Sequence, residues 1–572
     1  MIRKRKLCLV MAVLLTFALL VSACGDRQAS QSSETPSASV PPASNPSSAT
    51  PDPSKNYDPF GKYAEPIEIT AVGVLHPVEG EVPEGTTPEN QSFNKLAEEQ
   101  LNIKLKYLWT VTPDQYDQKF NVTIATGDIP DLIFTTQPAQ FENMIESGQL
   151  ADMSDAYQYL LPELKEMYEK DVPEVLASVQ RGDKLYSLPV AANRYESAQR
   201  LYIRNDWLKK LKLNAPTNYQ EMVAVAEAFV NQDPDGNNKK DTVGLAIHKN
   251  ILWGGSFGTL PLFQVFHAYP GYWVTGSDNQ LHDGIIAPEV KNALEGMQDL
   301  YKKGILDKEF ATKDDGMVVE DIIAGKVGMV FGEWWIPEWP LGLTVQQVEG
   351  SDWTAIPVPS VDANSAMPIV KRVTHYGFNS VSADCKNPEA AVKLINLFYD
   401  AFYNPKAKEK YGELVEQKNG FFHNFVPQKL WDAMASVDEF YRNNEAIKTR
   451  DSSKLPPREL NNHYVRSVAL LDNKDPAGWG IYNCMVADNS GYAYVAELTK
   501  SKKVIFDEFY GVPTEAMIEK GDTLSKMAQE TFVGIIMGDS VDEFDSFVAE
   551  YKGLGGDDIE KDVNGWYQSV PK

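Results

Sequence analysis

The stretch PIEITAVGVL (66–75) begins a run of five alternating segments that decides the fold class. The others, in order, are QSFNKLAEEQLN (91–102), IKLKYLW (103–109), PDQYDQKFNVTIATGD (113–128) and DLIFTT (131–136). The first and third alternate apolar and polar residues and predict strands, whereas the second and fourth have helical spacing. DLIFTT predicts a third, buried strand. Strand, helix, strand, helix, strand at this spacing predicts βαβ units in a parallel sheet with right-handed connections.

Open α/β sheets of this kind bind ligands beyond the carboxyl ends of their strands. Thr135 and Thr136 end a strand, so we expect them to lie in a cleft. The chain has 572 residues, which allows two or more domains with sizeable cores. Apolar spacing predicts further amphipathic helices over 215–232, 287–305, 386–400 and 522–538.

The N-terminus has the features of an export signal. Four basic residues (3–6) precede an apolar run from Leu7 to Val21, which closes on Ser22-Ala23-Cys24-Gly25. This ending resembles the lipobox of bacterial lipoproteins, which implies a signal peptide over 1–23 and thioether lipidation of Cys24. The alternatives are a plain secretory signal or a transmembrane helix, for which the run is short against about 20 residues. The Ser/Pro-rich segment 24–60 predicts a disordered tether.

Charge and cysteine content exclude several classes of function. The formal net charge is −26, so we expect no nucleic-acid partner and no long-range steering of an anionic substrate. Seven His and four Cys form no HExxH or Cys-x-x-Cys motif, so no zinc or redox role is indicated. Cys385 and Cys484 remain after the signal, and two widely spaced cysteines are weak evidence for a disulfide.

Seven segments spread over the chain carry a family resemblance in their order and spacing. They are TGDIPDLIF (126–134), GDKLYSLPV (182–190), LYIRNDWLKKLKLNAPTNYQE (201–221), GKVGMVFGEWW (325–335), NPEAAVKLINLFY (387–399), FYGVPTEAM (509–517) and IIMG (535–538). Together they resemble the extracellular solute-binding lipoproteins of bacterial ABC importers, and more narrowly the carbohydrate-type, LipO-like family 1 group.

The resemblance implies a periplasmic-binding-protein-like class II fold, in which two α/β lobes joined by a hinge hold the ligand between them. It implies closure on a carbohydrate, delivery to ABC permease subunits, no covalent chemistry and a lipid anchor at the outer face of the cell membrane. We expect a monomer. The family pattern assigns 61–190 and 371–440 to lobe one, and 191–370 and 441–572 to lobe two.

The segment GEWWIPEW (332–339) supplies the first candidates for ligand contact. Aromatic rings cover the CH-rich face of a neutral sugar, and carboxylates bind its hydroxyls. Glu333, Trp334 and Trp335 therefore suit a sugar site, and the resemblance places a stacking aromatic at Trp334 or Trp335. The alternative for these residues, and for Trp339, is packing between strand and helix.

Other candidates are more scattered. Trp253 precedes a glycine-rich stretch that suits a cleft loop, and Trp479 lies among turn residues. Trp273 falls on a predicted strand, where burial is the alternative to contact. His375 and Tyr376 lie near the expected hinge. Together with Thr135, these residues complete the predicted ligand site.

The segment DPDGNNKKD (233–241) resembles the first nine positions of a calcium loop, and related binding proteins carry similar loops with structural calcium. Asn238 replaces the usual Gly, and Gly244 stands where a bidentate Glu is usual. The alternative is a hydrophilic turn after a helix. The predicted Ca²⁺ ligands are the side chains of Asp233, Asp235, Asn237 and Asp241 and the carbonyl of Lys239.

Two other classes of function remain as alternatives. GGSFG (254–258) matches the G-x-S-x-G motif of Ser hydrolases, but the residues before it make a poor strand and Pro261 interrupts the segment after it. A surface-attached glycan-degrading enzyme is the better enzyme alternative, although no carboxylate pair is marked. A peptide receptor of the same fold is the alternative within the binding class.

Overall fold

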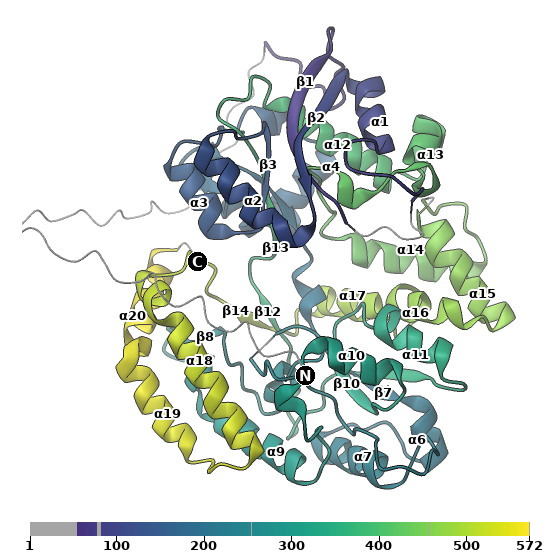
Figure 1. Ribbon diagram of the computed structural model, residues 1–572, viewed down its shortest axis with the longest axis vertical. Coiled ribbons are helices and arrows are strands. Elements are labelled where there is room, and N and C mark those ends of the chain that lie inside the picture. Colours follow the sequence, from purple (N-terminus) through teal and green to yellow (C-terminus); the bar gives the residue numbers. More distant parts are fainter. Residues whose placement is uncertain (1–53, 77–81, 253, 457, 571–572) are drawn as a thin grey trace, which may run out of the picture. The chain divides into compact units, whose positions relative to one another are not determined.

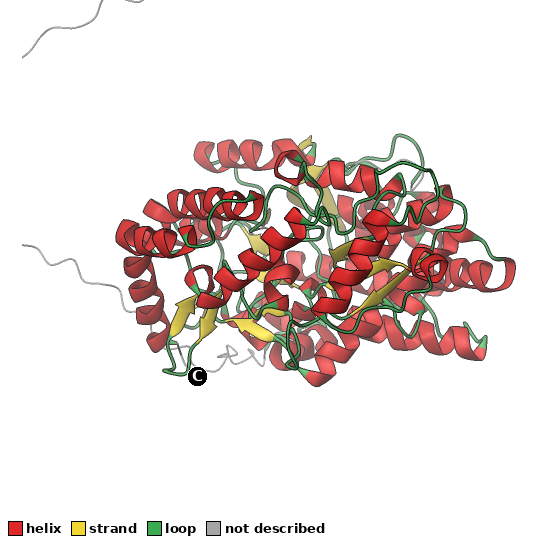
Figure 2. Cartoon of the chain, turned by 90° about the horizontal axis from the view of Figure 1, so that it is seen from below, coloured by secondary structure: helices red, strands yellow, loops and turns green. Residues whose placement is uncertain are grey.

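The computed structural model describes residues 54–76, 82–252, 254–456 and 458–570 (Figure 1). Cys24, the tether up to residue 53 and Trp253 lie outside the described residues. Figure 2 shows short strands surrounded by helices, the mixed α/β composition that the sequence predicts. Among the described residues, no helix is both long enough and apolar enough to cross a membrane.

The first two strands form the predicted parallel pair. β1 (Ile67–Val74) lies in register with β2 (Ile103–Val111), so that Ile67 faces Ile103, and α1 (Ser92–Leu101) connects them. A parallel pair needs such a crossover because its strands run in the same direction. This βαβ unit confirms the prediction from the opening stretch.

The pairing of β3 (Leu132–Thr135) differs from the expected parallel sheet. β3 hydrogen-bonds to β13 (His375–Val381) in an antiparallel arrangement, and β13 pairs antiparallel with β6 (Leu188–Ala191) on its other side. The central strand of this sheet therefore comes from a distant part of the chain, which no local pattern reveals. The Asp131 carboxylate joins β3 to β1 by accepting hydrogen bonds from the Thr70 amide (2.8 Å) and hydroxyl (2.7 Å).

These strands share one hydrophobic cluster with the helices around them. Phe120, Phe141 and Phe398 are buried in it. They belong respectively to α2 (Pro113–Thr126), α3 (Pro138–Glu146) and α12 (Glu389–Tyr403), the last matching the helix predicted over 386–400.

A second sheet has β7 (Arg200–Arg204) at its centre. β10 (Met329–Gly332) and β11 (Trp353–Ile356) flank it, both antiparallel. A second hydrophobic cluster unites this sheet with helices that lie between its strands in sequence and with the C-terminal helices. The helices are α6 (Asn205–Leu211), α7 (Tyr219–Asn231), α9 (Pro288–Lys302), α18 (Glu515–Met537), α19 (Glu543–Tyr551) and α20 (Asp557–Ser569).

The C-terminal helices return to residues far earlier in the chain. The Gln298 side chain of α9 donates to the carbonyls of Ile535 (2.5 Å) and Asp539 (2.8 Å), so α18 lies beside α9 (Figure 1). Helices α7, α9 and α18 fall where the apolar spacing predicts them. The proposed lobe boundaries stay a prediction.

A mainly helical region follows α12. It contains α14 (Ala435–Thr449), α15 (Val465–Asn473), α16 (Trp479–Ile481) and α17 (Gly491–Ser501). Two small pairs of strands, β8 (Trp273–Thr275) with β9 (Leu281–Asp283) and β12 (Ile369–Lys371) with β14 (Ile505–Asp507), and the helices α10 (Asp315–Ile323) and α11 (Gly342–Gln347) are further regular elements.

Candidate functional site

A cavity of about 1600 Å³ lies within the one compact unit that holds all described residues. Its walls come from the segment 191–196, the loop after β10, the end of α12 and the helices around α14 and α15. Ligand pockets for drug-sized molecules span about 300–1,000 Å³. The cavity therefore has room for a ligand larger than one sugar ring.

Aromatic side chains line this cavity from several elements. They are Trp334, Tyr376, Phe402, Tyr403, Phe421, Trp431 and Tyr492. Trp334 lies against Tyr492 with ring centroids 4.7 Å apart, and Phe402 lies against Trp431 at 5.3 Å. Such rings offer flat apolar faces to a ligand.

The loop that carries Trp334 is held by contacts to the helical region. The Sγ atom of Cys484 accepts a hydrogen bond from the Glu338 amide (3.1 Å) and lies 3.4 Å from the Trp335 carbonyl. Burial raises the pKa of this thiol, so it stays protonated. Cys484 and Cys385 are free cysteines.

Glu333 and Trp335 support the loop from outside the cavity lining. The Trp335 indole donates to Glu333 Oε2 at 2.7 Å, and the Glu333 amide donates to Ser256 Oγ at 3.2 Å. Burial raises the pKa of the Glu333 carboxyl. Trp335 also stacks on Trp339 with centroids 6.2 Å apart. Of the three residues predicted in this segment, Trp334 faces the cavity.

The other described ligand candidates lie in the protein interior. Trp273 is buried on β8 against Phe509, and Trp479 is buried with its indole 3.3 Å from Asp352 Oδ1. Thr135 is buried, and its hydroxyl accepts from the Gln137 amide. The cavity lining does not include any of these three side chains.

His375 packs on Phe378, and burial lowers its pKa to about 4, so its imidazole is neutral. Its neighbour Tyr376 lines the cavity instead and donates a hydrogen bond to Glu196 at 3.3 Å. Burial raises the pKa of the Glu196 carboxyl to about 7, although hydrogen bonds from Ser436 and Tyr376 oppose the shift. Sequence reasoning missed Glu196, which lies in the short 3-10 helix Arg194–Ser197 between β6 and β7.

A buried ionic network lies behind the part of the cavity wall that Arg458 and Glu439 line. Arg458 pairs with Glu439, and Arg442 pairs with Glu459 at 2.8 Å. Asn443 also donates to Glu459, at 2.7 Å. Burial raises the pKa of Glu439. Sequence reasoning missed this network too, because its members lie on helices with ordinary amphipathic spacing.

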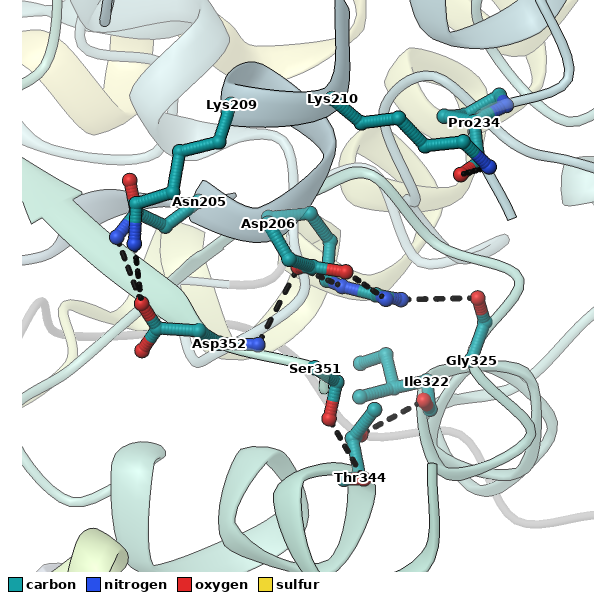
Figure 3. A network of polar contacts seen from close by, with 11 residues as sticks. Asn205, Asp206, Lys209, Lys210, Pro234, Ile322, Gly325, Thr344, Ser351 and Asp352 are labelled. Carbon is teal, nitrogen blue, oxygen red and sulfur yellow. Dashed lines mark hydrogen bonds and ion pairs between the residues drawn. The ribbon is translucent and has the colours of Figure 1, made fainter. Parts of the chain in front are cut away.

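The Arg-Asn-Asp-Trp segment at the start of α6 has a structural role. The Arg204 guanidinium donates to both oxygens of Asp206 (2.8 and 2.7 Å) and to the Gly325 carbonyl (3.0 Å). Figure 3 shows Asp206 and Asp352 side by side, where the Asp352 amide donates to Asp206 at 3.2 Å. Arg204 and Trp207 are almost fully buried. This network joins α6, β11 and the turn after α10.

The loop 233–241 brings several of its predicted cation ligands together. The Asn237 side-chain amide donates to Asp235 Oδ2 (2.7 Å) and Asp241 Oδ1 (3.0 Å), so three predicted ligands converge. Asp233 Oδ1 is buried without a hydrogen-bond partner, and Asn238 takes the positive φ of 59° expected where Gly is usual. Lys239 donates its amide to Asn237 Oδ1. Within the described ranges, no cluster of three or more His, Cys, Asp or Glu is arranged to hold a metal.

The G-x-S-x-G segment does not have the geometry of a nucleophile elbow. In such an elbow the Ser sits on a strained turn with its hydroxyl exposed. Here Phe257, and not Ser256, has the positive φ of 66°, and the buried Ser256 hydroxyl accepts from the Glu333 amide. Ser256 thus holds the loop that carries Trp334.

The α/β fold and the aromatic-lined cavity together define a protein built to enclose a ligand. The family model of the bacterial extracellular solute-binding proteins matches residues 84–405. The chain belongs to this family, as the sequence resemblance predicts.

Individual proteins similar to this chain are consistent with this family membership. Lipoprotein LipO of Bacillus subtilis is 22% identical over 507 residues (85% of this chain, 90% of the relative). The polygalacturonan/rhamnogalacturonan-binding protein YtcQ of the same organism is 23% identical (82% and 87%). The solved structure of the Streptococcus pneumoniae ABC-transporter substrate-binding protein FusA in complex with kestose has a TM-score of 0.57 at 17% identity (88% and 99%). The expected periplasmic-binding-protein fold is confirmed.

Proposed function

We propose that this protein is the lipid-anchored substrate-binding component of a carbohydrate ABC importer, which captures an oligosaccharide and delivers it to a membrane permease. The carrying observation is the cavity of about 1600 Å³ with Trp334, Tyr376 and Tyr492 in its walls. The name of YtcQ, a polygalacturonan/rhamnogalacturonan-binding protein, and the complex of FusA with kestose support a carbohydrate ligand.

The chemistry of the lining suits a sugar. Rings such as Trp334 cover the apolar face of a pyranose or furanose, and carboxylates and amides such as Glu196 and Asn193 bind its hydroxyls. The cavity lining combines residues of the first hydrophobic cluster, such as Ala191 and Ala401, with Trp334 on the loop after β10, so closure of one α/β lobe on the other would enclose the ligand. Binding without turnover is the proposed outcome.

A calorimetric and thermal-shift screen of the chain from residue 54 against oligosaccharides and peptides tests this proposal. Stabilisation by an oligosaccharide that is recovered intact supports it. Release of shorter products would assign the protein to the glycan-degrading enzymes, and stabilisation by peptides alone would overturn the carbohydrate assignment.

The lipid anchor requires its own experiment. In the full chain, Cys24→Ala should move the protein from the membrane fraction to the medium and abolish labelling by a fatty-acid probe. Cys8→Ala, which changes a cysteine inside the signal, is the matched control and should stay membrane-bound. Membrane retention of the Cys24→Ala protein would contradict lipidation at this residue.

We also propose that the loop 233–241 holds a structural calcium ion. The convergence of Asp235, Asn237 and Asp241 and the unpartnered Asp233 Oδ1 fit a hard cation, which prefers oxygen ligands. A chelator should lower the melting temperature, and Ca²⁺ should restore it in the wild type but not in Asp235→Asn. An unchanged melting temperature on chelation would overturn the calcium proposal.

A further inference from the structure

We propose that the cavity selects uncharged oligosaccharides and rejects sugar acids such as uronates. This inference rests on the proposed function and adds the chemical class of its ligand. It follows from the pairing of every Arg and Lys side chain along the cavity wall within the part of the chain that the structure describes.

Four basic side chains line the cavity, and each already has a carboxylate partner. Arg458 pairs with Glu439, and its guanidinium also lies over the Phe402 ring at 5.0 Å. Arg466 pairs with Glu338 at 2.9 Å. Glu439 and Glu338 already engage Nη2 of Arg458 and Arg466, so a uronate would have to compete with these carboxylates for the paired N–H groups that Arg offers to an anion.

The two lysines of the lining form a separate, balanced cluster. Lys408 and Lys418 bind Glu416 at 2.5 and 2.9 Å, and both also lie within 4 Å of Glu413. The two ammonium groups therefore share the carboxylates of Glu413 and Glu416, and both lysine side chains are partly exposed to solvent. A uronate would have to displace one of these carboxylates to gain an ion pair.

Two further carboxylates of the lining, Glu196 and Asp432, have no ion-pair partner among the described residues. Glu196 receives a hydrogen bond from Tyr376, and Asp432 receives hydrogen bonds from Tyr399 (3.1 Å) and the Met434 amide (2.8 Å). A ligand carboxylate beside Asp432, or beside Glu196 at a pH above about 7 where that carboxyl is ionised, would meet like charges in a partly desolvated site, which disfavours its binding. The overall charge of −26 adds to this repulsion.

The hydroxyl groups of a ligand, in contrast, match the polar atoms of the cavity wall that have no hydrogen-bond partner. Buried Arg458 Nε is a donor without a partner, and buried Glu439 Oε2 is an acceptor without one. A sugar hydroxyl both donates and accepts, whereas a carboxylate only accepts. Burial lowers the pKa of His423 and His463 to about 3, so neither imidazole supplies positive charge.

The test uses the chain from residue 54 in two stages. A thermal-shift panel first compares neutral oligosaccharides with oligogalacturonate and other acidic oligomers at equal concentration. We expect stabilisation by at least one neutral sugar and by no acidic one. Equal or greater stabilisation by an acidic oligomer would overturn the inference and leave the proposed function intact. Stabilisation by neither class would overturn the proposed function, and the inference with it.

The second stage compares the neutral ligand with a uronate form in which one primary CH₂OH group is oxidised to COO⁻, a change that adds one oxygen and a negative charge and removes one hydroxyl donor. Calorimetry at a pH above about 7, where the Glu196 carboxyl is ionised, should show at least about tenfold weaker binding of the acid than of the neutral sugar. Glu196→Gln and Asp432→Asn should each reduce the ratio of the affinity for the neutral sugar to the affinity for the acid. The control Glu543→Gln, which removes the same charge at an exposed position outside the cavity, should leave this ratio unchanged. An unchanged ratio in both cavity variants, or equal affinity for acid and neutral sugar, would contradict the inference.

Discussion

Gly491, the first residue of α17, lies so close to Trp334 that an added Cβ would fall 2.7 Å from Trp334 Cα. No real Cβ approaches a neighbour so closely, and the neighbouring atoms are mainly backbone. The indole of Trp334 can therefore face the cavity only because position 491 has no side chain.

Gly491→Ala should consequently displace the loop that carries Trp334. We expect a loss of about 1–3 kcal/mol in the free energy of unfolding, as for other overpacked sites, and a clear loss of ligand affinity. Urea denaturation and calorimetry measure the two effects.

Gly521→Ala is the matched control, because Gly521 lies in α18 with nothing within 4 Å of the added Cβ. That variant should keep its affinity and gain up to about 1 kcal/mol of stability from helix propensity. Unchanged affinity in Gly491→Ala would mean that the Trp334 loop does not position the ligand.

The stacking role of Trp334 is tested by its removal. Trp334→Ala should weaken oligosaccharide binding at least about tenfold, since buried aromatic contacts commonly dominate binding energy. Trp339→Ala removes an indole that is 46% exposed and outside the cavity lining, and should change affinity little. Equal losses of oligosaccharide affinity in the two variants would contradict a stacking role for Trp334, because they would show that any change in this segment weakens binding.

Glu196 predicts a pH dependence of stability. Its pKa rises from 4.5 to about 7 in the folded protein, so the folded state holds this proton more tightly than the unfolded chain does. The resulting stabilisation is complete below pH 4.5 and is lost as the pH rises through about 7. Urea denaturation of the ligand-free protein should show Glu196→Gln losing less stability than the wild type over this interval. A parallel decline in both proteins would show that Glu196 is not buried as described.

Arg204 predicts a purely structural effect. Its bidentate contact with Asp206 cannot be made by an ammonium group, so Arg204→Lys should destabilise the protein by about 2–3 kcal/mol. Lys209→Ala, which removes an exposed partner of Asp352, should cost less than about 1 kcal/mol. A ligand affinity that falls with Arg204→Lys while stability is unchanged would contradict the structural role.

The spacing of apolar residues in the sequence predicted the helices and the one βαβ unit whose residues are close together in the chain. The unit β1-α1-β2 and helices α7, α9, α12 and α18 follow from apolar spacing over one or two elements. The antiparallel insertion of β13 between β3 and β6 did not, because strand partners distant in sequence leave no periodic signal.

In the candidate site, too, some residues were predicted from local sequence patterns and others were missed. Trp334 was predicted because a glycine-flanked strand ends directly before a cluster of aromatic residues. Tyr492 and Arg458 were missed, because an aromatic or basic residue in an amphipathic helix looks the same whether it faces a core or a cavity. Trp273 and Trp479 were predicted as ligand contacts, and the structure buries both indoles.

The central claim is that the cavity beside Trp334 binds an uncharged oligosaccharide without cleaving it. Calorimetric titration of the wild-type chain from residue 54 with the neutral oligosaccharides of the panel, followed by mass spectrometry of the recovered sugar, tests it most directly. We expect saturable one-to-one binding of at least one of them, its recovery intact, and at least about tenfold weaker binding by Trp334→Ala. Absence of binding, or recovery of shortened sugars, would contradict the claim.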